Sequence, residues 1–157
     1  MTRDELHAAV RQLPARAALA LTVWGEARGE PVDGQVAVAW VIKNRAARRR
    51  QTVQKVCLAP WQFSCWWENS KNATLLATRA ETMLAGRIMP EPKWLDLLQR
   101  CHQVLIGSVP DPTGGADHYL TTTLYGSDNA PTWAGVMPVT QTIGRHTFLR
   151  DTGERRA

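Results

Sequence analysis

The sequence predicts an α+β domain that is mainly helical and ends in a small antiparallel β element. Up to about residue 106, apolar residues recur at helical spacing, whereas after Pro110 the chain is rich in Thr, Tyr, Val and Phe, which favour strands. With 157 residues the chain has the length of one ordinary domain. We therefore expect residues 1–157 to form a single unit, with a lead segment at 1–14.

The first three helices are delimited by proline and glycine. Residues 3–12 predict a leading helix, and a second helix is expected over 15–27, after an intervening proline. Gly29 is expected to stop that helix in the left-handed backbone region. Pro31 suits the first turn of a third helix that runs to about Arg49, and the many apolar residues of this helix place it in the core.

The remaining elements follow from turn residues and periodicity. Residues 51–71 contain a proline, several aromatic residues and Ser and Asn, which indicates a structured loop with about one turn of helix. A helix capped by Asn72 is expected to run through Arg87, and another spans 93–106. Strands are expected within 116–123 and 139–150, where a glycine breaks the second run and indicates a hairpin or small sheet.

The composition is that of a soluble globular protein, with 44% hydrophobic and 21% charged residues, and no apolar run is long enough to span a bilayer. Much of the basic excess, which gives a net charge of +5, lies in residues 43–55 and in four C-terminal arginines, Arg145, Arg150, Arg155 and Arg156. Such segments favour polyanions: nucleic acid, an acidic cell-wall polymer or anionic lipid headgroups. The alternative is a solvated helix end whose arginines complement the helix dipole.

The three cysteines, Cys57, Cys65 and Cys101, cannot all pair, and none lies in a Cys-x-x-Cys arrangement. A Cys57–Cys65 disulfide is possible by proximity, but small apolar packing is the favoured role of each thiol. The chain also lacks the Gly-x-Ser-x-Gly and phosphate-binding glycine motifs. We expect no metal and no cofactor.

The acidic turn at residues 24–31, Trp-Gly-Glu-Ala-Arg-Gly-Glu-Pro, is the first candidate for chemistry. Glu26 falls in the last turn of a buried helix, where the helix dipole and poor solvation disfavour a charged carboxyl. A protonated Glu can donate a proton to the leaving oxygen of a glycosidic bond. The alternative is that Glu26 and Glu30 flank Arg28 in an exposed turn, as weak surface ion pairs.

The loop after the third helix carries candidate saccharide contacts, because exposed aromatic residues in loops often mark binding sites. Aromatic faces can cover sugar rings, while amides and hydroxyls bind the sugar hydroxyl groups. The candidates in this loop are Trp61, Gln62, Phe63, Ser64 and Trp66. His118, Tyr119 and His146 could also place an imidazole or a phenol near a substrate, although a lone His in a strand is more often structural.

Three parts of the sequence resemble the SleB-type cell-wall hydrolases, a family named for a spore cortex-lytic enzyme and also found among phage endolysins. Residues 17–45 closely resemble the family signature, and residues 60–66 resemble its Gln-Phe-Ser loop. Residues 143–150 resemble its closing Ile-Gly-x-His-x-Phe-x-Arg, and residues 115–119 lie where the family has a small-aromatic segment. The resemblance spans about residues 15–150.

This resemblance implies a lysozyme-like fold and cleavage of the β-1,4 bond between N-acetylmuramic acid and N-acetylglucosamine in peptidoglycan, commonly as a lytic transglycosylase. It also implies that Glu26 is the catalytic acid/base. A transglycosylase needs one carboxyl, because the muramic 6-hydroxyl attacks the anomeric carbon and gives a 1,6-anhydro product. A hydrolytic muramidase needs a second carboxyl, for which Glu30 is the nearest candidate.

Two other classes of function remain open at this stage. One is a peptidoglycan-binding module without activity, and the other is a basic nucleic-acid-binding domain, for which the sequence has no recognised motif. The expected partner is a peptidoglycan glycan strand, bound by a monomer, and nucleic acid is not expected. The N-terminus lacks the apolar core of a secretory signal. The expected setting is thus a phage endolysin made in the cytoplasm and released to the wall through a holin-type pore, with basic segments that could contact an anionic outer membrane.

Overall fold

The computed structural model describes residues 1–67 and 70–153, so the basic residues Arg155 and Arg156 lie outside the described residues. The helices in chain order are α1 (Arg3–Gln12), α2 (Ala15–Ala27), α3 (Val32–Arg49), α4 (Val53–Cys57), α5 (Ala73–Leu84), α6 (Pro92–Ile106) and the short α7 (Thr122–Tyr125). Two 3-10 turns, η1 (Ser64–Trp66) and η2 (Thr132–Gly135), and three strands, β1 (His118–Thr121), β2 (Val139–Ile143) and β3 (His146–Leu149), complete it. The predicted α+β class is confirmed.

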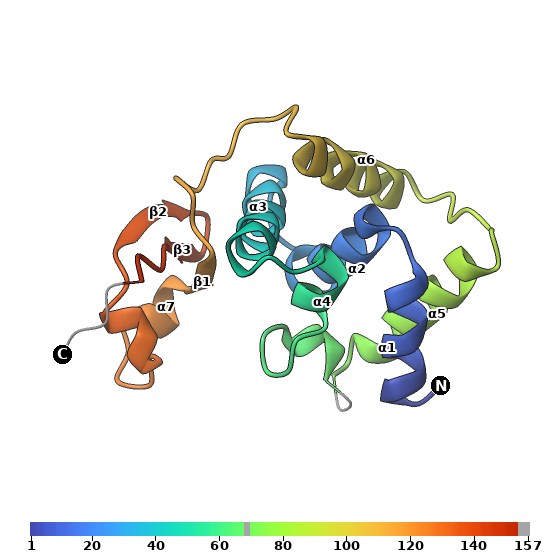
Figure 1. The fold of residues 1–157 in the computed structure, drawn as a ribbon, viewed down its shortest axis with the longest axis horizontal. Helices are drawn as coiled ribbons and strands as arrows, with labels where there is room; N and C mark the ends of the chain where they lie inside the picture. Colours follow the sequence, from blue (N-terminus) through green and yellow to red (C-terminus); the bar gives the residue numbers. More distant parts are fainter. Residues whose placement is uncertain (68–69, 154–157) are drawn as a thin grey trace.

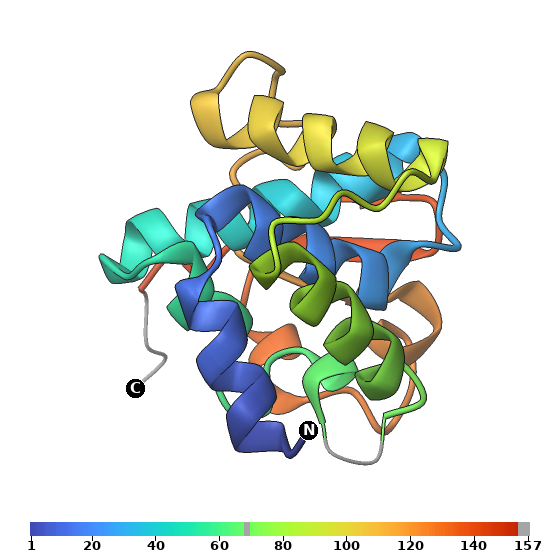
Figure 2. The same ribbon diagram turned by 90° about the vertical axis from the view of Figure 1, so that its right-hand side faces the viewer.

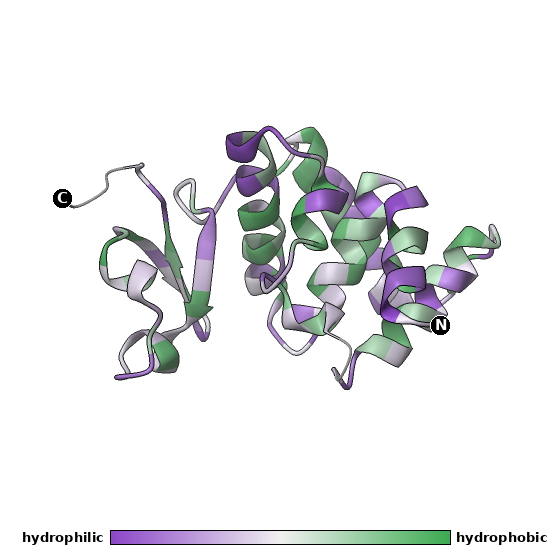
Figure 3. Ribbon diagram, turned by 60° about the horizontal axis from the view of Figure 1, so that its bottom comes forward, coloured by the Kyte–Doolittle hydropathy of each residue, from purple (hydrophilic) through white to green (hydrophobic). Residues whose placement is uncertain are grey.

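Helix α2 lies at the centre of the helical part of the molecule. It packs against α3, α4, α5 and α6, and every residue from 17 to 23 is buried. Figure 1 shows the small sheet on one side of α3 and helices α1 and α5 on the far side of α2, while Figure 2 shows α6 crossing over this layer. The hydrophobic colouring of Figure 3 is concentrated on the central helices. Because each fully buried Leu or Val side chain contributes about 1.5–3 kcal/mol, α2 anchors the domain.

The sheet is antiparallel, with strand order β1-β3-β2, and the central strand β3 is buried along its length. On one face of the sheet, Phe148 packs against Ala37 and Val41 of α3. On the other face, Leu120 and Leu149 are covered by the η2 segment. One face of the sheet therefore packs against α3, and the opposite face packs against the η2 segment.

Most predicted helix boundaries agree with the structure within a residue or two, but three details differ. Helix α5 ends at Leu84 rather than Arg87, because Gly86 takes the left-handed conformation, with φ of 69°. Gly29 is not left-handed: α2 ends at Ala27, and Arg28 keeps helical backbone angles. The short elements α7 and η2, which lie between β1 and β2, carry too few residues for periodicity to reveal them.

All three cysteines are free and buried, so no Cys57–Cys65 disulfide is present. Burial raises the pKa of the Cys57 thiol to about 12 and also raises the pKa values of Cys65 and Cys101. The predicted packing role is confirmed by their place in the main hydrophobic cluster. Within the part of the chain that the structure describes, no helix combines the length and apolarity needed to cross a membrane.

Candidate active site

The carboxyl group of Glu26 is held by donors from two other parts of the chain. It stands in the last turn of α2 and is half-buried. Its Oε1 accepts a hydrogen bond from the Cys65 amide at 2.9 Å and a longer one from Ser64 Oγ at 3.5 Å, and its Oε2 accepts one from the Tyr119 hydroxyl at 3.4 Å. The donors come from the segment at 64–65 and from β1. They fix the carboxyl in one orientation.

The loop that carries Ser64 and Cys65 reaches Glu26 because position 25 has no side chain. A Cβ at Gly25 would lie 2.6 Å from the Cys65 Cβ and 2.9 Å from its Sγ. Asn72, expected to cap α5, instead donates to the Gly25 carbonyl at 2.9 Å and makes no side-chain cap. Gly25 therefore permits the close approach of backbone that supplies the Cys65 N–H.

Tyr119 and His146 form an aromatic wall behind Glu26. Tyr119 projects from β1, and its ring meets His146 edge to face at 5.1 Å. Burial and the neighbouring Glu26 carboxylate raise the pKa of Tyr119 well above its usual value, which keeps the phenol protonated as a donor. Burial lowers the pKa of His146, against the attraction of Glu30 and Glu26, and its Nδ1 has no hydrogen-bond partner among the described residues. His146 is thus a neutral imidazole beside the carboxyl.

Glu30 lies under the turn between β2 and β3. Its side chain is only 10% exposed, and its Oε1 pairs with Arg145 at 3.2 Å. Gly144, with φ of 56°, leaves room for it, since a Cβ there would lie 3.4 Å from Glu30 Oε2. Arg28 stacks on Trp24 and bonds to Asn72 at 2.7 Å; within residues 1–67 and 70–153 it pairs with neither glutamate. The alternative of an exposed turn with Arg28 ion pairs is therefore wrong.

The candidate aromatic contacts separate into exposed and buried residues. Trp61 is 82% exposed, has a left-handed backbone with φ of 63°, and meets the exposed Trp67 at 5.9 Å. Gln62 and Ser64 are also exposed. Phe63 and Trp66 are buried, and Trp66 donates to Thr22 Oγ1 at 3.2 Å. The prediction that Phe63 and Trp66 contact substrate is thus corrected: both rings pack in the core.

His118 and Tyr119 point to opposite faces of β1, as neighbouring strand residues must. Tyr119 faces Glu26, whereas the His118 ring packs against Trp133 at 5.1 Å and its Nδ1 lies 2.9 Å from Asp117 Oδ1. The sheet therefore separates His118 from the Glu26 site, and the predicted substrate contact is corrected for this residue.

Arg45 is buried, although the sequence places it in the basic segment at 43–55. It is 5% exposed, donates to the Asp117 carbonyl at 2.8 Å and to Gln62 Oε1 at 2.9 Å, and its guanidinium lies 5.4 Å from the Phe63 ring centroid. Burial lowers its pKa to about 10, so it remains cationic at neutral pH. Arg45 follows Ile42 by three residues and so lies on the apolar face of α3, which is the sequence signal that indicates its burial. Arg45 thus joins residues 61–67, which we call the aromatic loop, to the segment that leads into β1.

Comparison with known proteins places this arrangement among cell-wall enzymes. The family described as Cell Wall Hydrolase matches residues 29–149, a span that includes Glu30 and begins three residues after Glu26. The chain is similar to spore cortex-lytic enzymes of Oceanobacillus iheyensis, with 30% identity over 136 residues, and of Halalkalibacterium halodurans, with 34% over 133 residues. These alignments cover 84% and 83% of this chain but 40% and 33% of the relatives, so the chain spans about two fifths of their length or less.

Two solved structures share the fold. The catalytic domain of the germination-specific lytic transglycosylase SleB from Bacillus anthracis aligns with a TM-score of 0.58 and 28% identity, over 87% of this chain and 93% of that one. The catalytic domain of the Bacillus cereus SleB protein aligns with a TM-score of 0.59 and 27% identity, over 87% and 89%. The predicted fold likeness is confirmed.

Proposed function

Because this chain belongs to the cell wall hydrolase family, we propose that it cleaves the β-1,4 bond between N-acetylmuramic acid and N-acetylglucosamine in peptidoglycan, as a lytic transglycosylase. The observation that supports this most is the Glu26 carboxyl, oriented by donors from the aromatic loop and from β1. The similarity to the SleB catalytic domains adds to it.

Glu26 acts in both steps of the proposed reaction. In the first step its carboxylic acid donates a proton to the departing glycosidic oxygen while the bond to the anomeric carbon breaks. The hydrogen bonds from the Cys65 amide and the Tyr119 hydroxyl stabilise the carboxylate that this transfer leaves. In the second step the carboxylate takes the proton of the muramic 6-hydroxyl as its oxygen bonds to the anomeric carbon. The products are a 1,6-anhydro-muramoyl end and a free N-acetylglucosamine 4-hydroxyl.

One carboxyl is enough for this sequence, and the setting of the second acid agrees with that. Glu30 pairs with Arg145 at the β2–β3 turn, whereas Glu26 accepts hydrogen bonds from the uncharged Cys65 amide and Tyr119 hydroxyl. A hydrolytic muramidase would use Glu30 or another acid to activate water. The two reactions leave different ends on the glycan.

Mass spectrometry of peptidoglycan digested with the purified protein tests the proposal. We expect anhydro-muramic ends; new reducing ends would mean hydrolysis, and intact glycan would mean binding alone. Glu26→Gln should keep the fold and abolish cleavage. The matched control is Glu81→Gln, since Glu81 is exposed on α5. Undiminished cleavage by Glu26→Gln would refute the role of Glu26.

The endolysin role, the action at the wall after holin-type release, the monomeric state and the outer-membrane contact also stay proposals. Lysis of host cells that co-express a holin tests the first two, and size-exclusion chromatography tests the third. For the fourth, part of the basic segment at 43–55 is already engaged: Arg45 is buried, and Lys43 donates to the Val104 carbonyl at 2.8 Å. Arg49, Arg50 and Lys55 remain exposed for such a contact.

A further inference from the structure

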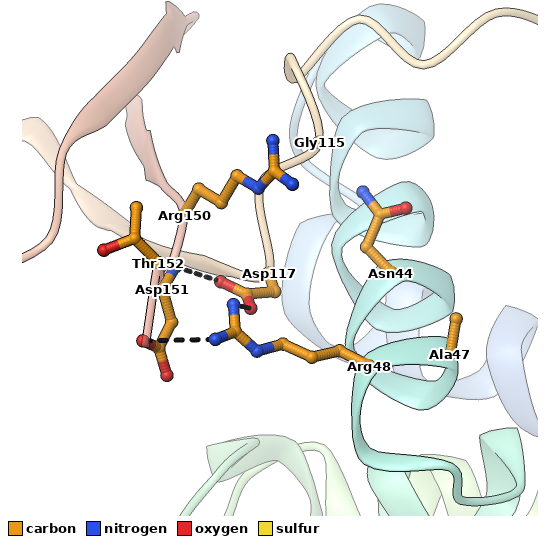
Figure 4. A pocket seen from close by; sticks show the side chains of 8 residues that line it. All are labelled: Asn44, Ala47, Arg48, Gly115, Asp117, Arg150, Asp151 and Thr152. Carbon is orange, nitrogen blue, oxygen red and sulfur yellow. Dashed lines mark hydrogen bonds and ion pairs between the residues drawn. The ribbon is translucent and has the colours of Figure 1, made fainter. Parts of the chain in front are cut away.

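A cavity of about 540 Å³ lies between the C-terminal half of α3 and the segments that flank β1 and β3 (Figure 4). One wall is an ion-pair network in which Arg48 bonds to Asp117 at 2.9 Å and to Asp151 at 3.3 Å. Asp117 is 2% exposed and also accepts the Asp151 amide at 2.9 Å. This network holds one guanidinium against two carboxylates, and Asp117 Oδ1 also lies 2.9 Å from His118 Nδ1, so it gives the cavity a fixed polar floor.

Two groups that face this cavity have unused hydrogen-bonding capacity. The exposed Arg150 side chain has no ion-pair or hydrogen-bond partner in the described part of the chain and lies beside Gly115, where a Cβ would be 3.7 Å from Arg150 Nη1. Asn44 donates from Nδ2 to Asp111 Oδ2 and to the Ala116 carbonyl, both at 2.9 Å. Its Oδ1 receives no hydrogen bond from residues 1–67 or 70–153. Figure 4 shows Arg150 and Asn44 on opposite walls of the cavity.

We propose that this cavity binds the free carboxylate of a peptide attached to the muramic residue of the substrate. A guanidinium without a carboxylate partner matches a carboxylate with two N–H donors in one plane. The Asn44 Oδ1 can accept the peptide N–H that precedes the carboxylate. This inference rests on the proposed function, because peptidoglycan carries such a peptide on the muramic lactyl group.

The position of the cavity fits a chain that branches from the cleaved bond. Asp117 and Tyr119 lie two residues apart along one face of the β1 segment, a spacing of about 6.6 Å. Tyr119 touches Glu26, and Asp117 forms the cavity floor. A peptide of four or five residues reaches about 13–18 Å when extended. That length exceeds the spacing between the two positions, so a peptide on a muramic residue at Glu26 is long enough to reach Arg150. Because this face of the sheet packs on α3, the peptide would pass over the outside of these elements and not between them.

Binding tests this inference without requiring cleavage. The probe is N-acetylmuramoyl pentapeptide, titrated by calorimetry into the full chain, with the same compound carrying amidated carboxyls as its counterpart. We expect the acid to bind more tightly, and Arg150→Gln to weaken that binding about 10-fold while leaving the amide unaffected. Arg87→Gln, which removes the same charge from an exposed position outside this cavity, should change neither. Equal binding of acid and amide, or of Arg150→Gln and wild type, overturns the proposal.

Cleavage assays separate a failure of this inference from a failure of the proposed function. Glycan strands with intact peptides and strands stripped of peptide by an amidase are compared as substrates. We expect Arg150→Gln to raise KM on the first and not on the second. An equal change in KM on both kinds of strand would refute the peptide site but would leave the transglycosylase activity supported. If the protein binds the peptide acid selectively but cleaves neither glycan, the peptide site is supported and the proposed transglycosylase activity is refuted.

Discussion

Gly25 offers the sharpest test of how the site is assembled, because the methyl group of Gly25→Ala has no room. Its Cβ would lie 2.6 Å from the Cys65 Cβ, 2.9 Å from the Cys65 Sγ and 3.3 Å from Leu76 Cδ1. Overpacking of this kind costs about 1–3 kcal/mol, whereas alanine gains about 1 kcal/mol over glycine inside a helix. We therefore expect a net loss of about 0–2 kcal/mol in unfolding free energy.

The loss of activity should exceed the loss of stability. To relieve the contact, the loop must move away from α2 and carry the Cys65 amide away from Glu26, from its present distance of 2.9 Å. A hydrogen bond to a charged group contributes about 1.5–3 kcal/mol, which corresponds to a fall in kcat of about 10- to 150-fold. The assays are thermal unfolding by circular dichroism and release of soluble muropeptides.

A second substitution shows whether the contact itself is responsible. Cys65→Gly removes both atoms nearest the new methyl group while keeping the backbone N–H. The double variant Gly25→Ala, Cys65→Gly should therefore be more active than expected if the activity losses of the two single variants simply added. The reasoning would be refuted if Gly25→Ala had wild-type activity and a raised melting temperature. The higher helix propensity of alanine alone would then account for the effect of the substitution.

Three further predictions address other parts of the molecule. Tyr119→Phe removes a donor 3.4 Å from Glu26 Oε2 and should lower kcat about 2- to 10-fold with little change in melting temperature; a change confined to KM in steady-state assays would contradict it. Trp61→Asn suits the left-handed backbone and removes an exposed ring, so unfolding should show unchanged or slightly higher stability while sedimentation with peptidoglycan shows weaker binding; tighter binding would contradict this. Burial lowers the pKa of His7, so the unfolded chain takes up a proton more readily and stability falls as pH drops through about 6.5. His7→Leu should lose part of this acid sensitivity in melts at several pH values, and an identical pH profile would count against the argument.

The sequence predicts the helices well because their apolar residues recur at helical spacing, which places them on the one face that packs against the core. Residues 3–12, 15–27 and 93–106 match α1, α2 and α6 within one residue. The junction that carries Glu26 was equally visible, since proline and glycine mark it. Local patterns of this kind do not depend on distant contacts.

The aromatic loop shows where such prediction fails. Trp61 is exposed and Trp66 is buried, yet both stand in a segment without periodicity, and only contacts with α2 and α3 decide between them. Arg45 shows the opposite case, since its position on the apolar face of α3 was informative but its charge outweighed that position in our interpretation. Strand alternation likewise predicts that His118 and Tyr119 cannot both face Glu26.

The buried, unpaired sulfhydryl groups have a consequence for the environments that the protein can tolerate. A thiol with a pKa of about 12, as at Cys57, carries almost no thiolate at neutral pH, and the thiolate is the species that oxidants and disulfides attack. No cross-link holds the fold together, so reducing agents have nothing to break. The same conformation should therefore persist in glutathione-rich and in oxidising surroundings.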